Sequence, residues 1–176
     1  GRWRTPLGRN RHHEENLKKQ KMSEKTAIIG PAGGREHALG WRLANEGSEV
    51  LFTEGNAGTE QIGINLPKHL RAHDRASATM LARWLKRNKI QRVVVGPENP
   101  LSIGVVDACL EQGVPVFGPV EAAAQLETSK SYMHELAKIN GVPVGESWSY
   151  NTAEDALRAL DPLAHVVKND GLDFGK

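Results

Sequence analysis

The chain has 176 residues, of which 39% are hydrophobic, and its formal net charge is +2. This length is enough for one domain, or for one domain and part of a second. Its apolar stretches fall well short of the roughly 20 residues that a membrane-spanning helix needs. The single cysteine, Cys109, cannot form a disulfide within the chain and is expected to be a small buried residue on a helix. Composition therefore argues against a membrane-spanning or disulfide-stabilised protein, and we expect a cytoplasmic location.

Basic charge is concentrated at the start of the chain. Residues 1–21 hold seven Lys and Arg against two Glu, whereas the remainder holds 16 basic and 19 acidic residues. We therefore expect residues 1–23 to be a disordered basic leader, and we expect no nucleic-acid binding by the folded part. Met22 is the expected natural start, because the fold pattern begins four residues later.

From Thr26 onward, short β-branched runs alternate with helix-length segments, which predicts a parallel α/β architecture. Strands are expected at about 26–30, 49–53, 62–66, 91–95 and 114–117. Helices are expected at about 35–46, 75–88, 102–112, 120–126 and 129–140. Gly47 suits the residue that ends the first helix, and Asp74 can cap the start of the second.

The pattern changes beyond Pro143. A strand is expected at 144–149, then a helix at 153–160 with Thr152 as its N-cap, then a buried strand at 164–168. A turn at 169–171 follows. We expect residues 24–120 to form a complete N-terminal α/β domain and residues 121–176 to begin a second domain.

A glycine-rich turn, Gly30–Gly34, connects the first expected strand to the first expected helix. Glycine lets the backbone approach a ligand closely, and the free N–H groups of a first helical turn favour an anion. A nicotinamide or flavin fingerprint is the competing interpretation, with Glu54 as its ribose-binding acid. The glycine spacing disfavours it, because Gly30, Gly33 and Gly34 do not fit G-x-G-x-x-G. The turn alone indicates an α/β protein that binds a phosphate.

Five sequence blocks occur in order along the chain: GGREHAL at 33–39, GNAGTE at 55–60, VGPENPL at 95–101, FGP followed by AAQLETSK at 117–130, and VVKNDGL at 166–172. In this order the blocks resemble phosphoribosylamine–glycine ligase, also called glycinamide ribonucleotide synthetase, an ATP-grasp enzyme family of purine biosynthesis. The resemblance covers residues 26–176. It implies a Rossmann-like, parallel-sheet N-terminal (pre-ATP-grasp) domain, followed by the beginning of an ATP-grasp domain.

The resemblance also implies the reaction and its ligands. In that family ATP phosphorylates the carboxylate of glycine, and the amine of 5-phosphoribosylamine then displaces phosphate to form an amide. Mg²⁺ or Mn²⁺ neutralises phosphate charge, with ligands expected in a missing C-terminal part, and no side chain is expected to do covalent chemistry. The partners are therefore small molecules, namely glycine, 5-phosphoribosylamine and ATP.

Two groups of site residues follow from the same resemblance. The residues expected to face the substrates lie in three loops: Gly33, Gly34, Arg35 and Glu36, then Gly55, Asn56, Gly58 and Thr59, and then Pro97, Glu98 and Pro100. Glu98 is the expected polar contact at the amine and glycine site. The residues expected to approach the phosphates of ATP are Lys130, Lys168, Asp170, Gly171, Gly175 and Lys176.

The chain departs from the family pattern in several places. Pro31 adds a residue to the first loop and removes an N–H donor. Asn169, Asp173 and Phe174 replace smaller residues near the phosphate loop, and the family protein is considerably longer. We therefore expect a fragment that binds phosphoribosyl ligands weakly and shows no ligase turnover. The alternatives are another ATP-grasp ligase that acts on a different carboxylate, and a non-catalytic module that binds a phosphoribosyl group or a nucleotide.

Overall fold

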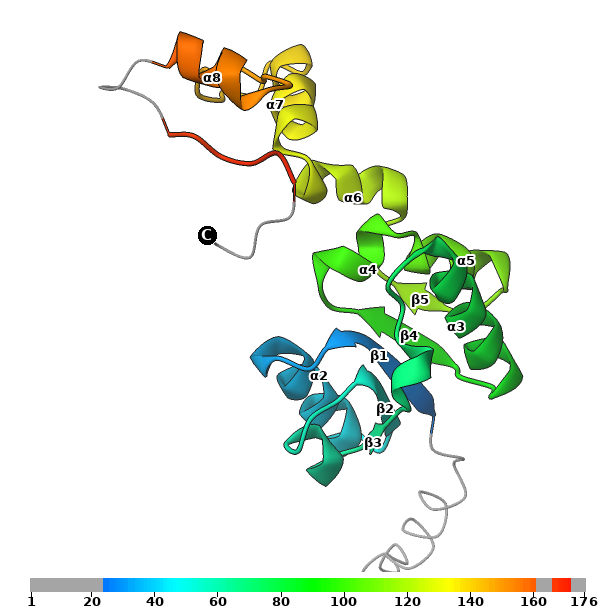
Figure 1. Cartoon of the computed structure of the whole chain (residues 1–176). Coiled ribbons are helices and arrows are strands. Elements are labelled where there is room, and N and C mark those ends of the chain that lie inside the picture. Colours follow the sequence, from blue (N-terminus) through cyan, green and yellow to red (C-terminus); the bar gives the residue numbers. More distant parts are fainter. Residues whose placement is uncertain (1–23, 161–165, 172–176) are drawn as a thin grey trace, which may run out of the picture.

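A computed structural model of the chain describes residues 24–160 and 166–171 (Figure 1). The expected leader, 1–23, lies outside the described residues, as do 161–165 and 172–176. Within the described ranges, none of the helices is both long enough and apolar enough to cross a bilayer.

A five-stranded sheet forms the centre of the N-terminal region, in the order β3-β2-β1-β4-β5. Every pairing between neighbouring strands is parallel. The chain therefore returns to the same edge of the sheet before each new strand. The strands are β1 (Lys25–Pro31), β2 (Glu49–Glu54), β3 (Ile64–Asn65), β4 (Arg92–Val95) and β5 (Val116–Phe117). The predicted parallel α/β class is confirmed, and each strand expected before residue 120 is present.

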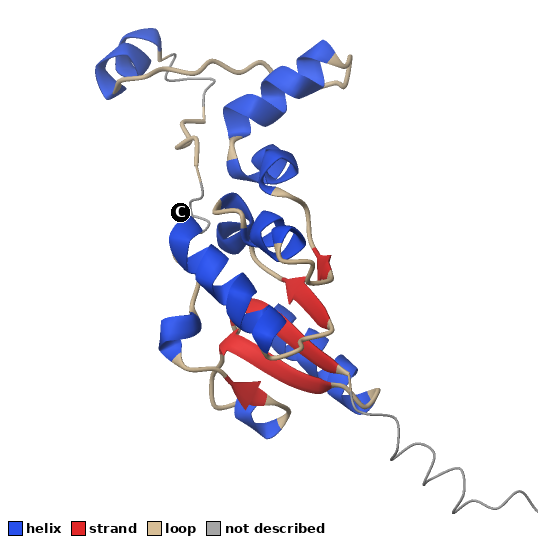
Figure 2. Ribbon diagram, turned by 90° about the vertical axis from the view of Figure 1, so that its right-hand side faces the viewer, coloured by secondary structure: helices blue, strands red, loops and turns tan. Residues whose placement is uncertain are grey.

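Helices cover both faces of this sheet (Figure 2). Those of the N-terminal region are α2 (Gly34–Asn45), η1 (Thr59–Gln61), η2 (Lys68–Leu70), α3 (Arg75–Arg87), α4 (Glu98–Ser102) and α5 (Val105–Glu111). Three more helices follow the sheet: α6 (Glu121–Thr128), α7 (Lys130–Ile139) and α8 (Ala153–Ala159). Figure 1 shows α6, α7 and α8 leading away from the sheet.

Successive side chains of a strand point to opposite faces of the sheet, so each face has a hydrophobic core of its own. On one face, strand residues such as Ala27, Ile29 and Val93 pack with α3 and α5 into the larger cluster. On the other face, Ile28, Val50 and Phe52 pack beneath α2. Gly40 allows this close packing, because a Cβ atom there would lie 2.3 Å from Cζ of Phe52. The two cores fix α2 and α3 against the sheet that carries the loops.

Local sequence signals set the helix ends as expected. Asp74 precedes α3 and accepts a hydrogen bond from the N–H of Ser77 at 2.7 Å. Gly47 follows α2 with a φ of +93°, and Thr152 caps α8. Cys109 is fully buried on α5, and its burial raises the pKa of the thiol to about 11. Cys109 is therefore a small buried residue on a helix, as expected from the sequence.

Three expectations about secondary structure are wrong. The helix expected at 102–112 begins later, as α5 at Val105 after Gly104 (φ +75°), and the residues before it form a separate short helix, α4. Residues 144–149 form no strand, and Val166 and Val167 are 81% and 72% exposed instead of lying in a buried strand. A strand needs a neighbour for its backbone groups. Among the described residues, the sheet lies entirely within 25–117.

Candidate functional site

Three loops meet at the carboxyl edge of the sheet. They follow β1, β2 and β4, which are neighbours in the strand order. The order reverses at β1, because β2 and β3 extend the sheet on one side of it and β4 and β5 on the other. Open α/β sheets bind ligands at such a reversal, in the crevice at the carboxyl ends of the strands. The loops after β1 and β4 flank this point, and they carry residues that are expected to face the substrates.

The end of β1 and the loop after β4 are in direct contact. Gly30 has a φ of +127°, and a Cβ atom there would lie 2.3 Å from the ring of Pro97. The additional residue Pro31 remains within β1, where the pairing register with β2 shifts between Ile28 and Pro31. Ala32 then donates its N–H to the Glu54 carbonyl at 2.9 Å. The irregular register thus accommodates Pro31 without detaching the loop from β2.

Glu36 lies beneath this contact, with only 3% of its surface exposed. Its carboxylate accepts hydrogen bonds from the Gly33 N–H at 3.1 Å and from Arg35 Nε at 2.8 Å. Burial alone would raise the pKa of Glu36, but these bonds and the start of α2 hold it below its usual value. A Cβ atom at Gly96 would lie 2.4 Å from Oε1 of Glu36. Glu36 therefore orients Arg35 and fills the space over Gly96.

Arg35 connects the two loops electrostatically. Its Nη1 atom lies 3.8 Å from Oε1 of Glu98, while its Nε atom contacts Glu36. Glu98 is the first residue of α4, and Pro97 precedes it, so the expected Pro-rich loop is a short helix. Pro100 is buried in its first turn. Half of the Arg35 side chain remains exposed, so its unused N–H groups can reach an anion at this edge.

The loop after β2 is held by its own side chains. Asn56 donates from Nδ2 to the Ala32 carbonyl at 2.7 Å, and its Oδ1 accepts the N–H groups of Gly58 and Thr59. Thr59 is fully buried and bonds Asn65 at 2.6 Å. A Cβ atom at Gly55 would lie only 1.6 Å from Oδ1 of Asn65. The loop after β2 is therefore tied to the loop after β1.

Asn65 and Gly96 were missed as site residues by sequence reasoning. Each acts through a contact with a residue distant in the sequence, and neither contact leaves a local pattern.

Glu54, which was considered as a ribose-binding acid, forms an ion pair with Arg71 at 2.9 Å. Burial raises the pKa of Glu54, and the positive charge of Arg71 partly opposes that shift.

A second cluster of predicted site residues lies at the start of α7. Lys130 Nζ donates to the carbonyl oxygens of Asn169 and Gly171 at 2.9 and 2.7 Å. Asp170 accepts hydrogen bonds from the first turn of α7. Lys168 is exposed beside this cluster, whereas Gly175 and Lys176 lie outside the described residues. The structure thus brings Lys130, Asp170 and Gly171 together.

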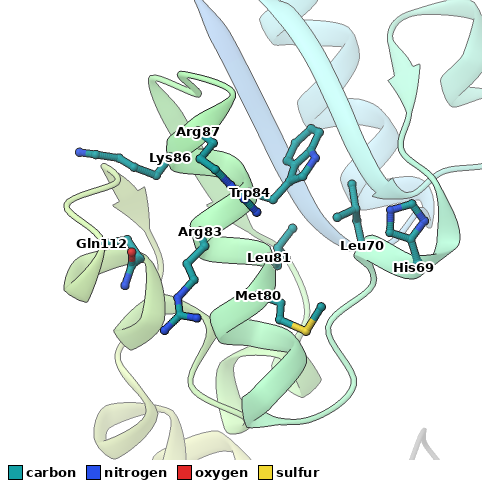
Figure 3. A pocket seen from close by; sticks show the side chains of 9 residues that line it. All are labelled: His69, Leu70, Met80, Leu81, Arg83, Trp84, Lys86, Arg87 and Gln112. Atoms are coloured by element: carbon teal, nitrogen blue, oxygen red, sulfur yellow. The ribbon is translucent and has the colours of Figure 1, made fainter.

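A cavity of about 530 Å³ lies elsewhere, over α3 and η2 (Figure 3). Its walls include Trp84, Met80 and Leu70, with Arg83, Lys86 and Arg87 on the same helix. None of the predicted site residues lines it. Within 24–160 and 166–171, no group of three or more His, Cys, Asp or Glu could hold a metal ion.

The curated relatives of the chain are named phosphoribosylamine–glycine ligases or trifunctional purine biosynthetic proteins. The chain is 36% identical over 165 residues to the phosphoribosylamine–glycine ligase of Rhodopirellula baltica, covering 88% of this chain and 37% of that protein. It is 42% identical over 159 residues to that of Vibrio parahaemolyticus, covering 85% and 35%. It is also 40% identical over 166 residues to the human trifunctional purine biosynthetic protein adenosine-3, covering 88% and 15%. The chain therefore spans about a third of the bacterial relatives and less of the human one.

Solved structures and a family model agree with this relationship. The crystal structure of phosphoribosylamine–glycine ligase from Thermotoga maritima matches with a TM-score of 0.59 at 31% identity, over 84% of this chain and 33% of that one. A biotin carboxylase domain of a bacterial carboxylase shares the fold alone, with a TM-score of 0.55 at 18% identity over 77% and 33%. The model of the phosphoribosylglycinamide synthetase N domain matches residues 24–127. This chain belongs to the phosphoribosylglycinamide synthetase family.

Proposed function

We propose that this chain supplies the phosphoribosylamine-binding part of a phosphoribosylamine–glycine ligase. Such an enzyme joins glycine to 5-phosphoribosylamine and gives glycinamide ribonucleotide in purine biosynthesis. The contact of Arg35 with both Glu36 and Glu98, at the reversal point of the sheet, is the observation that carries the proposal. The names of the relatives support the same reaction.

The three loops divide the recognition of the sugar phosphate. Arg35 and the N–H groups of the first turn of α2, which begins at Gly34, are suited to phosphate oxygens, and Gly33, whose own N–H is taken by Glu36, lets the backbone approach closely. The loop of Gly55, Asn56, Gly58 and Thr59 borders them through Ala32. Glu98, held by Pro97 and Pro100 at the start of α4, offers a carboxylate to the substrate amine. These loops therefore bind and orient the substrate.

We further propose that residues 121–176 begin an ATP-grasp domain, after an N-terminal domain at 24–120. Lys130, Lys168, Asp170, Gly171, Gly175 and Lys176 form its contribution to the nucleotide site. Two lysines beside a glycine-bearing turn are a donor set that fits phosphate oxygens. ATP, when bound, supplies the phosphoryl group that activates the carboxylate of glycine. Mg²⁺ or Mn²⁺ would accompany it, with ligands outside the described residues. Small-molecule substrates, no nucleic-acid partner and a cytoplasmic location fit this proposal.

Calorimetric titration with glycinamide ribonucleotide, the stable product, tests the sugar-phosphate site without requiring turnover. We expect weak binding to the wild-type chain and at least about a tenfold loss in Arg35→Ala, the order expected when a charged hydrogen bond is removed. Arg42→Ala is the matched control, because Arg42 lies on the same helix and pairs with Glu46 one turn away. Equal affinities of the Arg35 and Arg42 variants would contradict the proposal.

A further inference from the structure

The turn at Asn169–Gly171 is fastened to the start of α7 from both directions. Lys130 Nζ donates to the carbonyl oxygens of Asn169 and Gly171. In return, the carboxylate of Asp170 accepts the N–H of Ser131 at 2.9 Å and its hydroxyl at 2.6 Å. The hydroxyl of Ser129, the N-cap of α7, approaches the same carboxylate at 3.2 Å. These contacts join segments about 40 residues apart in the sequence.

We propose that Asp170 is a positioning residue, whose carboxylate holds the Asn169–Gly171 turn on α7 and thereby fixes the ammonium group of Lys130. This set of contacts, between 129–131 and 169–171, is called the Asp170 clamp below. This proposal rests on the proposed function only because it takes from it that Lys130 contacts the phosphates of ATP. It changes the expected role of Asp170, which acts through Lys130 and does not touch the nucleotide.

The charge of Asp170 is the first argument for this role. A free carboxylate beside a triphosphate would repel it. Here the carboxylate instead occupies the start of α7, where unpaired N–H groups and the helix dipole favour negative charge. Hydrogen bonds from Ser131 hold the pKa of Asp170 below its usual range. The clamp brings Lys130 close to this carboxylate from about 40 residues away, and Lys168 lies two residues before it in the sequence.

The donors of Lys130 are the second argument. An ammonium group has three N–H donors and no acceptor. Two of them can be directed to the carbonyl oxygens of Asn169 and Gly171, which leaves one for an incoming phosphate oxygen. A lysine held in this way has fewer rotamers to lose when it binds an anion. The clamp therefore prepares Lys130 for its ligand.

Carbon-13 NMR titration of the Asp170 carboxyl group, in the 176-residue chain without nucleotide, tests the clamp directly. We expect a midpoint below the usual aspartate range in the wild type, and a rise toward that range in Ser131→Ala. Ser131→Thr retains a hydroxyl and should restore the low midpoint. Ser149→Ala, at an exposed serine of the irregular segment, should leave it unchanged. The same midpoint in the wild type and Ser131→Ala would overturn the proposal.

Titration with MgATP then separates positioning from direct contact. If Asp170 acts through the clamp, Ser131→Ala and Asp170→Asn should lose nucleotide affinity together, by several-fold, and Ser131→Thr should recover it. If Asp170 contacts the nucleotide directly, only Asp170→Asn should change affinity, and the proposal is wrong. A wild-type chain that binds no MgATP would contradict the nucleotide role in the proposed function, while the carboxyl titration still decides the clamp.

Discussion

The N-terminal sheet region and the segment after residue 120 are stabilised in different ways. Around the sheet, α3 alone buries Ala78, Leu81, Ala82 and Leu85. In contrast, neither α7 nor α8 contains a buried residue, and Leu157 on α8 is 69% exposed. Ala124 on α6 is buried, but beyond α6 the specific contacts are polar and include the cap of α8 and the Asp170 clamp. A buried core therefore supports the elements that carry the substrate loops, whereas the proposed nucleotide residues Lys130 and Asp170 are held by hydrogen bonds.

Substituting one leucine in each region tests most directly whether the two regions are stabilised differently. Leu81→Ala should lower the free energy of unfolding by about 2–5 kcal/mol, because it leaves a cavity in the larger core. Leu157→Ala should change it by less than about 0.5 kcal/mol, because its side chain is already in solvent. Urea denaturation followed by far-ultraviolet circular dichroism measures both. Similar losses in the two variants would show that α8 is also packed.

A Gly→Ala substitution in each region tests how tightly the backbone of that region is packed. Gly96→Ala should cost about 1–3 kcal/mol, because its Cβ atom would press on the buried carboxylate of Glu36. It should also weaken glycinamide ribonucleotide binding, because Glu36 orients Arg35. Gly145→Ala is the control, since a Cβ atom there has no atom within 4 Å. Equal stability and affinity of the two variants would mean that Glu36 can move aside at little cost.

A change of pH should affect the loop region through Glu36. Its lowered pKa contributes stability above the ordinary glutamate pKa, and this contribution is lost as the pH falls through the folded-state value. Glu36→Gln should therefore lower stability by about 1 kcal/mol at neutral pH and flatten the acid limb on the acid side of the ordinary glutamate pKa of about 4.3. Urea midpoints across that range provide the measurement.

Glu54 should change stability with pH in the opposite direction to Glu36. Its pKa is raised by burial, so its contribution favours the folded state at low pH and fades as the pH rises. An acid limb of identical slope in the wild type and Glu36→Gln would exclude Glu36 as the group responsible.

The smallest effect is expected at the surface of α2. Arg42→Ala removes an exposed pair with Glu46 and should change the free energy of unfolding by no more than about 0.5 kcal/mol. Thermal melting at low and high salt measures this difference. A larger loss would indicate that Arg42 supports the packing of α2 beneath the substrate loops.

The sequence predicts the sheet region well because its signals are local. Apolar runs mark the strands, Asp74 and Gly47 mark helix ends, and parallel pairing brings the loops of Arg35 and Glu98 to one edge. The start of α4 was mistaken for a loop, since Pro97 and Pro100 are equally compatible with a first helical turn.

Contacts between distant residues explain what the sequence did not predict. The strands expected at 144–149 and 164–168 have apolar residues, but apolar character does not reveal whether a neighbouring strand exists. The roles of Asn65, Gly96 and the Asp170 carboxylate depend in the same way on residues far along the chain. The family resemblance placed Asp170 near the phosphates of ATP, but only the structure shows that its carboxylate faces the start of α7.

The mutual fit of Gly30 with Pro97, and of Gly96 with Glu36, has a consequence for redesign. Gly30 in β1 leaves space for Pro97, and Gly96 after β4 leaves space for Glu36 on α2, so the β1–α2 and β4–α4 segments have to be exchanged as a matched pair. Grafting only one of them from a ligase of different specificity would introduce a collision or leave a gap. Libraries that recombine both segments jointly should therefore yield more folded variants than libraries that randomise either alone.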